Sequence, residues 1–192
     1  CAMFMQDITR FAAAPVQVGH ITQIASAHTS FGLVAGTLVE TGAGWRGIET
    51  LHIGESLYTL DGGLARIVAM NRREVLPGEP VIRIAGGHFD ACSELFLMPG
   101  QDLILDTMGL TEAPYACLSA EALAACPGVS RSATPRRIEV VTPIFAEEEA
   151  VWAQSGVLLR CPGVKPDAAS AYPRMHDRAA AVFLETRQRR FS

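Results

Sequence analysis

The sequence predicts an all-β fold with one helix added at its C-terminal end. Between residues 32 and 163, short apolar segments alternate with polar residues as they do in half-buried strands. Turn-forming glycine, proline and aspartate separate these segments at short intervals, and the residues after 164 change to a helical pattern. These observations favour a closed or strongly bent sheet of short strands.

The predicted strands follow one another along the central part of the chain. Residues 36–41 end at the turn Gly42-Ala43-Gly44, and residues 56–60 run into Asp61-Gly62-Gly63. Glycine adopts positive φ without steric cost, so both places predict hairpins. Further strands are predicted over residues 48–53, 64–70, 80–85, 95–98, 102–106, 137–142 and 150–154.

Two segments carry helix signals instead. Residues 118–125 predict a short helix that Ser119 caps. Pro173 fits the first turn of a second helix that ends near Arg190, with arginines in its last turn that complement the helix dipole. The apolar stripe expected on this second helix consists of Ala179, Val182, Phe183 and Phe191.

The chain therefore divides into three zones. Residues 1–31 are expected to be an extended lead-in that packs on the main body, and residues 32–163 to be the β domain. Residues 164–192 are expected to be a linker, Lys165-Pro166-Asp167, followed by the helix. A chain of 192 residues supports one sizeable core.

Composition narrows the function classes. Apolar residues make up 49% and charged residues 19% of the chain, with a mean hydropathy of +0.21, which indicates a surface that a partner covers. A net charge of −4 argues against nucleic-acid binding, and no apolar run is long enough to span a membrane. The first residue is Cys1, which suggests a missing or processed start, so localisation stays open with the cytoplasm slightly favoured.

Cysteine usage and familiar motifs give no strong site. The five cysteines are widely spaced without a CxxC, which indicates buried thiols rather than disulfides or a zinc ribbon. Gly42-Ala43-Gly44-Trp45-Arg46-Gly47 matches G-x-G-x-x-G, but no helix pattern follows, so a hairpin is the better interpretation. No catalytic, cofactor-binding or metal-binding residue is assigned, and no cofactor is expected.

Three weaker clusters are interpreted as structural. His88 and Cys92 lie in a loop-like segment without further ligands nearby, which favours a structural or surface role over a metal pair. The run Glu147-Glu148-Glu149 is expected to be a solvated turn rather than a cation site. The arginines 187, 189 and 190 are expected to form a soluble helix end.

The order of several segments resembles bacterial Hint (Hedgehog/intein-type) domains. The residues 32–37 resemble the Cys-Phe-x-x-Gly-Thr opening of that family, with Gly36-Thr37 retained. Further resemblance lies in residues 47–55, 59–63, 80–86, 97–105, 144–153 and 162–163. The resemblance covers about two thirds of the chain and implies a horseshoe of short bent strands.

The resemblance also implies which residues would carry chemistry. In the family a cysteine attacks the preceding peptide bond, and a Thr/Ser-x-x-His pair assists this N-to-S acyl shift. This chain has Gly32 at the cysteine position, Met98 at the Thr/Ser position and Gln101 at the histidine position, and Glu148 where a further histidine is common. The groups needed for the acyl shift are thus replaced together.

These replacements predict a non-catalytic Hint-like module, not an enzyme, that binds a protein partner or serves in a larger assembly; a homo-oligomer stays open. The alternative is a self-processing domain, or a cysteine hydrolase, that uses a thiol such as Cys92. A third hypothesis is that the chain is one piece of a longer polypeptide and that residues 1–31 occupy its pocket.

Overall fold

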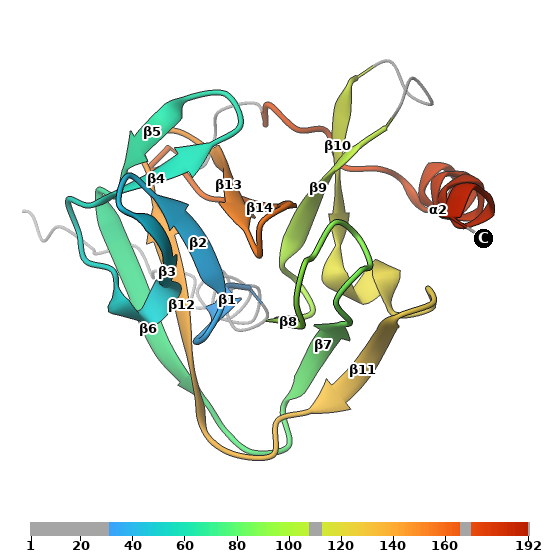
Figure 1. The fold of residues 1–192 in the computed structure, drawn as a ribbon, viewed down its shortest axis with the longest axis horizontal. Helices are drawn as coiled ribbons and strands as arrows, with labels where there is room; N and C mark the ends of the chain where they lie inside the picture. Colours follow the sequence, from blue (N-terminus) through green and yellow to red (C-terminus); the bar gives the residue numbers. More distant parts are fainter. Residues whose placement is uncertain (1–30, 108–112, 166–169, 192) are drawn as a thin grey trace, which may run out of the picture.

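Short strands account for most of the folded chain. The computed structural model describes residues 31–107, 113–165 and 170–191, and these ranges contain the elements labelled in Figure 1. The strands are β1 (Leu33–Val34), β2 (Leu38–Thr41), β3 (Gly44–Gly47), β4 (Ser56–Thr59), β5 (Gly63–Arg66), β6 (Ala69–Val75), β7 (Pro80–Ile84), β8 (Leu95–Leu97), β9 (Asp102–Asp106), β10 (Tyr115–Ser119), β11 (Val129–Ala133), β12 (Ile138–Ile144), β13 (Glu149–Ala153) and β14 (Val157–Cys161). The helices are η1 (Ile48–Thr50), η2 (Ala120–Leu123) and α2 (Asp177–Phe191).

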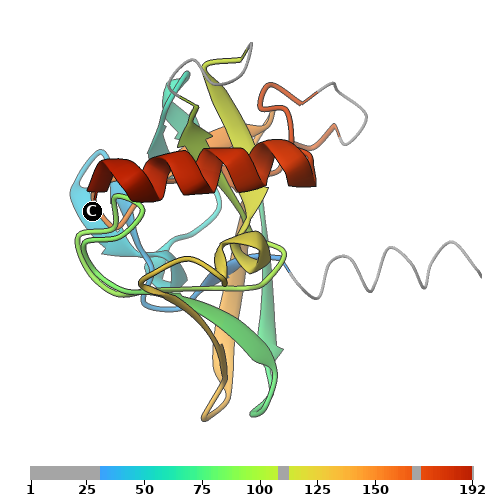
Figure 2. The same cartoon turned by 90° about the vertical axis from the view of Figure 1, so that its right-hand side faces the viewer.

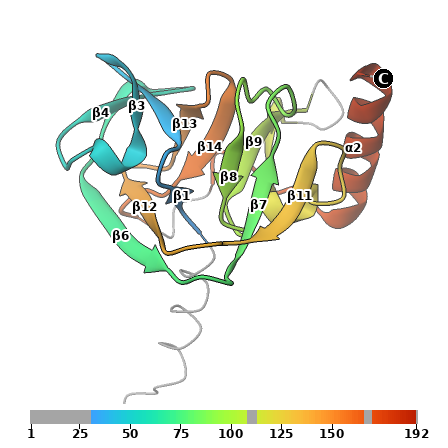
Figure 3. The same ribbon diagram turned by 60° about the horizontal axis from the view of Figure 1, so that its bottom comes forward.

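The strands form two antiparallel sheets, and both sheets interleave early and late parts of the chain. One sheet has the order β11-β7-β8-β1-β12-β6. The other has the order β10-β9-β14-β13-β2-β4-β5, with β3 beside β2. Strand β1 therefore lies between β8 and β12, which places the start of the β domain next to two much later segments (Figures 1 and 3). This all-β architecture with a C-terminal helix confirms the predicted fold class.

Alternation along the strands sorts side chains between the core and the outer faces. In β2, Val39 and Thr41 are buried, whereas Leu38 is exposed. Leu57 of β4 and Val151 of β13 are buried in the same core cluster as Val39. Burial of each large aliphatic side chain contributes roughly 1.5–3 kcal/mol, so this cluster is the main source of stability.

Most of the predicted strands are confirmed with small shifts of their bounds, but residues 48–53 are not a strand. Ile48–Thr50 forms the 3-10 helix η1, and a loop follows. Thr50 Oγ1 donates to the carbonyl of Gly47 (2.8 Å), and Glu55 accepts from the amide of His52 (2.6 Å). These side chains bind backbone groups that a ladder would use. The predicted strand over residues 64–70 is divided between β5 and β6, and β1, β3, β10, β11 and β14 were not predicted.

Both glycine-rich turns are hairpins, as predicted. The segment that matches G-x-G-x-x-G is the turn between β2 and β3, where Thr41 pairs with Gly44. Thr41 Oγ1 accepts from the amide of Ala43 (3.1 Å) and donates to the carbonyl of Gly44 (2.7 Å). No helix opens at this turn that could hold a pyrophosphate.

The helix predictions are confirmed in kind and corrected in detail. Ser119 caps η2 by accepting from the amide of Ala122 (3.4 Å). Helix α2 begins at Asp177 rather than Pro173, because the residues before it pair with the edge of β10. The carbonyl of Pro173 accepts from Cys117 N (2.9 Å), and Met175 N donates to Cys117 O (3.0 Å).

The buried face of α2 differs from the predicted stripe. Ala180 and Phe183 are buried against the core, whereas Val182 is 54% exposed. The helix lies at one end of the molecule, beside β10 (Figures 1 and 2). No helix in the described ranges is both long and apolar enough to cross a membrane. The lead-in up to residue 30, Pro166-Asp167 of the linker and the side chain of Phe191 lie outside the described part, so those predictions stay predictions.

Candidate functional site

The positions that the sequence singled out come together where β1 passes between β8 and β12. Leu33 pairs with Leu97 on one side and with Val141 on the other. The neighbouring position, Gly32, is therefore level with Met98, at the end of β8. A turn after Met98 is closed by the amide of Gln101, which donates to the carbonyl of Met98 (2.9 Å).

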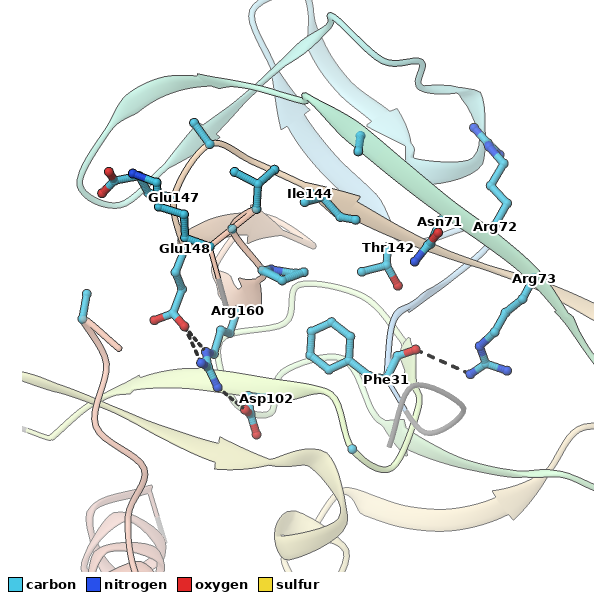
Figure 4. A pocket seen from close by; sticks show the side chains of 18 of the residues that line it. Phe31, Asn71, Arg72, Arg73, Asp102, Thr142, Ile144, Glu147, Glu148 and Arg160 are labelled. Carbon is cyan, nitrogen blue, oxygen red and sulfur yellow. Dashed lines mark hydrogen bonds and ion pairs between the residues drawn. The ribbon is translucent and has the colours of Figure 1, made fainter. Parts of the chain in front are cut away.

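A cavity of about 1050 Å³ opens beside these positions (Figure 4). One wall is the face of β6 and β12, which carries Asn71, Thr142 and Ile144. The opposite wall contains Asp102, Glu148 and Arg160, and Phe31 lies between the walls (Figure 4). The remaining lining residues are Ala69, Arg72, Arg73, Gly100, Ala146, Glu147, Pro162, Gly163, Val164, Lys165, Ala171 and Arg174.

Gly32 has no room for a side chain. Its φ is +123°, a conformation that L-residues with a Cβ rarely adopt. A Cβ built there would lie 2.5 Å from Val140 Cγ1 and 2.8 Å from Thr142 Oγ1. Both distances are well below van der Waals contact, so the surrounding strand is fitted to glycine.

Met98 and Gln101 serve the packing of the site. Met98 is buried in a small apolar cluster with Val34, Val75 and Val140, among others. Gln101 is fully buried, and its Nε2 donates to the carbonyls of Asp102 (3.0 Å) and Arg160 (2.9 Å). The Gln101 amide therefore joins the start of β9 to β14, while its Oε1 is buried without a hydrogen-bond partner in the described part.

A charged group centred on Asp102 forms one wall of the cavity. The side chain of Asp102 is 2% exposed, and its Oδ2 accepts from Arg160 Nη1 (3.1 Å) and Arg174 Nη2 (2.6 Å). Arg160 Nε also donates to Glu148 (2.7 Å). Burial alone would lower the pKa of Arg160, but its hydrogen bonds with Glu148 and Asp102 raise it above the ordinary value.

The residues before α2 fasten the C-terminal segment to this site. Ser170 Oγ donates to Glu148 Oε1 (2.6 Å), and the buried Tyr172 donates its hydroxyl to Asp61. Burial and the bond to Asp61 raise the pKa of Tyr172. With Arg174 on Asp102, three side chains of the segment 170–175 hold it against the β4–β5 turn, the start of β9 and the residue that precedes β13.

The structure also shows the surroundings of the acidic run and of His88 and Cys92, two of the three weaker clusters. Glu148 is ion-paired with Arg160, so the run Glu147-Glu148-Glu149 is not simply the solvated turn that was predicted, although Glu147 is exposed. His88 packs its ring against Gly128, while Cys92 is exposed. Among the described residues no group of three or more His, Cys, Asp or Glu could hold a metal ion.

Of the three arginines near the C-terminal end, the structure describes the side chain of Arg187, which contacts the protein surface. Arg187 donates to Asp90 (2.6 Å), and its guanidinium lies 5.4 Å from the centre of the Phe89 ring. This contact pins the end of α2 to the loop that contains His88 and Cys92. The side chains of arginines 189 and 190 lie outside the described part.

No cysteine among the described residues lines the cavity. Cys117, Cys126 and Cys161 are buried and unbridged, which agrees with the predicted buried thiols. Burial raises the pKa of Cys117 to about 12, and the carboxylate of Asp102 adds to this shift. Burial likewise raises the pKa of Cys161. A buried thiol with a raised pKa is a poor nucleophile at neutral pH.

We therefore expect a sharp difference in thiol reactivity. Iodoacetamide at pH 8 should modify Cys92 within minutes, and should leave Cys117 and Cys161 unmodified until the chain is unfolded in guanidinium. Peptide mass spectrometry after timed quenching measures each site separately. Equal labelling of Cys117 and Cys92 in the native protein would contradict the burial of Cys117.

Asp102, Arg160 and Arg174 were not singled out from the sequence. Arg160 and Arg174 follow Asp102 by 58 and 72 residues, so no local sequence motif could have predicted that the three side chains meet. Only Arg160 carried a weak signal, because an arginine in the otherwise apolar run 157–161 requires a partner when it is half-buried.

Comparisons with known proteins agree with this architecture. A family model described as Hint domain matches residues 31–158, about two thirds of the chain. No curated protein sequence matches the chain significantly.

Several solved structures are also similar. The solution structure of a bacterial intein-like domain from Clostridium thermocellum has a TM-score of 0.51 at 12% identity, covering 67% of this chain and 97% of that domain. The TvoVMA intein has a TM-score of 0.46 at 12% identity, covering 68% and 98%, and the MchDnaB-1 intein has 0.42 at 16%, covering 66% and 98%. At these identities the first likeness concerns the fold alone. The family match covers more than half of the chain, which belongs to the Hint domain family.

Proposed function

We propose that this Hint domain does not process itself and acts by binding a protein partner or as a subunit of a larger assembly. The observation that carries the proposal is the state of Gly32. The position expected to hold the attacking side chain has none, and its positive φ and its contacts with Val140 and Thr142 leave no space for one.

An N-to-S or N-to-O acyl shift requires a nucleophilic side chain at position 32 or close to it. A nucleophile must attack the carbonyl carbon of the preceding residue, here Phe31, and the leaving amine of Gly32 must receive a proton. Within the described residues, no thiol or imidazole lines the cavity. Thr142 offers a hydroxyl beside Gly32, but a hydroxyl needs a general base to attack at neutral pH.

The charged residues of the cavity are poor substitutes for the missing acid and base. Arginine stays protonated at any physiological pH, so Arg160 and Arg174 do not exchange protons. Glu148 and Asp102 are engaged with these arginines and with Ser170. This arrangement supports a structural role for the charged group, in which only Glu148 stands at a position where the family has a reactive residue.

Intact-mass measurement tests the non-processing half of the proposal. The full chain, carrying a reporter ahead of Cys1, should keep a single full-length mass after a day at pH 7–8 with excess dithiothreitol or hydroxylamine. A product that begins at Gly32 would overturn the proposal. The matched variants Thr142→Ala and Cys92→Ala then identify the group responsible, because only loss of the true nucleophile abolishes that product.

The alternative function is self-processing or hydrolysis by a thiol, and the exposed Cys92 favours it. The backbone amide of Cys92 donates to the carbonyl of Gln154 (3.1 Å). Cys92 does not line the cavity. Thiol-dependent cleavage that Cys92→Ala removes would establish this alternative. A chain that stays strictly monomeric in sedimentation and captures no protein would count against the binding half of the proposal.

A further inference from the structure

A single carboxylate stands among apolar side chains on the outer face of β2–β5. Trp45 of β3 is paired directly with Glu40 of β2. Thr41 is paired with Leu57 in β4, so Glu40 and Tyr58, the residues next to this pair, both point to the opposite, outer face of the sheet. Directly paired residues share one face of a sheet, and neighbouring strands lie about 4.8 Å apart. Trp45, Glu40 and Tyr58 thus lie on one face, near the point where Val39 of β2 and Thr59 of β4 both pair with β13.

Two leucines complete the surroundings of Glu40. Leu64 of β5 is paired with Tyr58, and its Cδ atoms reach to within 3.9 Å of the Cβ position of Gly42. Leu38 lies two residues before Glu40 on β2 and therefore points to the same face. Leu38, Trp45, Tyr58 and Leu64 are between 38% and 50% exposed. We call Leu38, Glu40, Trp45, Tyr58 and Leu64 the Glu40 face.

Glu40 differs from the carboxylates around it in having no partner. Glu55 is paired with Arg46 (2.6 Å), and Glu49 accepts from the amide of Gly36 (2.8 Å). Within the described residues the half-buried carboxylate of Glu40 makes no hydrogen bond or ion pair. An unpaired carboxylate ringed by aromatic and aliphatic side chains complements a cation that also carries apolar surface.

We propose that the Glu40 face docks a protein partner through one arginine or lysine flanked by apolar residues. The cation binds the Glu40 carboxylate, while Trp45 and Tyr58 stand on either side of it. Trp45 is the direct cross-strand neighbour of Glu40, and Tyr58 lies on the same face of β4, so a planar guanidinium bound to Glu40 can contact aromatic rings from both neighbouring strands. Arginine is favoured over lysine, because its planar group both stacks and forms paired hydrogen bonds. This inference rests on the binding half of the proposed function and names the chemistry of the partner.

A matched pair of peptides tests the proposal on the full chain. Acetyl-Leu-Arg-Leu-amide should shift the NMR signal of the Trp45 indole N–H on titration, and acetyl-Leu-citrulline-Leu-amide, which is neutral but similar in shape, should bind at least about fivefold more weakly. The chain has two tryptophans, so Trp45→Phe assigns the signal.

Glu40→Gln should weaken binding of the arginine peptide by roughly two- to fivefold, since the ion pair is lost while the aromatic contacts remain. Glu185→Gln removes another exposed carboxylate, on α2, and should leave binding unchanged. Preserved dispersion of the amide spectrum confirms that both variants are folded.

Three outcomes overturn the inference. The first is equal affinity for the two peptides, and the second is no binding up to the solubility limit of the arginine peptide. The third is self-association of the wild-type chain that Glu40→Gln abolishes and the peptide does not disturb, which assigns the face to a second copy. Cleavage before Gly32 would contradict the proposed non-processing function without touching the peptide result, so the two failures are distinguishable.

Discussion

Replacement of Asp102 by asparagine should destabilise the chain by about 3 kcal/mol, because it removes the buried negative charge to which both Arg160 and Arg174 donate. Asp102 is 2% exposed and accepts from both Arg160 and Arg174. Arg160 keeps its ion pair with Glu148 after the substitution, but Arg174 loses its ion pair with Asp102. Urea unfolding followed by circular dichroism measures the loss.

The control for Asp102→Asn is Glu74→Gln. Glu74 pairs with Arg137 at the surface, where both side chains are 62% exposed, so its loss should cost no more than about 0.5 kcal/mol. Hydrogen exchange in residues 170–176 should also rise in Asp102→Asn and not in Glu74→Gln, because Arg174 ties that segment to Asp102. Equal stability of the two variants would show that the group around Asp102 contributes little to the fold.

Replacement of Gly32 by alanine or cysteine should also destabilise the chain by about 3 kcal/mol, combining the strain of positive φ with an overlap in the core. The new Cβ would meet Val140 and Thr142 at 2.5 and 2.8 Å. Gly36→Ala is the matched control, since Gly36 has φ +94° with open space around its Cβ position. That control should lose only about 1 kcal/mol.

Comparison of the two glycine variants by thermal and urea unfolding separates strain from crowding. Similar losses for Gly32→Ala and Gly36→Ala would mean that strand β12 gives way, and the case against a reactive side chain at position 32 would weaken. A much larger loss at Gly32 means that restoring a cysteine alone cannot restore the chemistry, because β12 would first have to move.

The sequence was sufficient to predict the elements that depend on local patterns. Alternation and glycine turns predicted β2, β4, β7 and β9, and Ser119 was correctly predicted to cap η2. Apolar residues at Ile48 and Leu51 misled the strand prediction, since both are buried from a 3-10 turn and the loop after it. The backbone near Arg174 pairs with Cys117, so α2 begins at Asp177 instead of Pro173. No local sequence pattern predicts such a long-range contact.

By itself the sequence predicted the all-β class, which the structure confirms, and its resemblance to Hint domains predicted that Gly32, Met98 and Gln101 replace the reactive residues. These conclusions depend on residue types and on order along the chain. Only the tertiary structure shows that Gly32 has a positive φ that favours glycine. It also shows that Asp102 accepts hydrogen bonds from two arginines that lie 58 and 72 residues away in the sequence. Within the described part of the chain, it also leaves the Glu40 carboxylate without an ion pair on the face that carries Trp45 and Tyr58. The physical reason is strand pairing, which brings residues that are far apart in the sequence to within about 5 Å of one another. Local sequence patterns carry no information about which strands will pair.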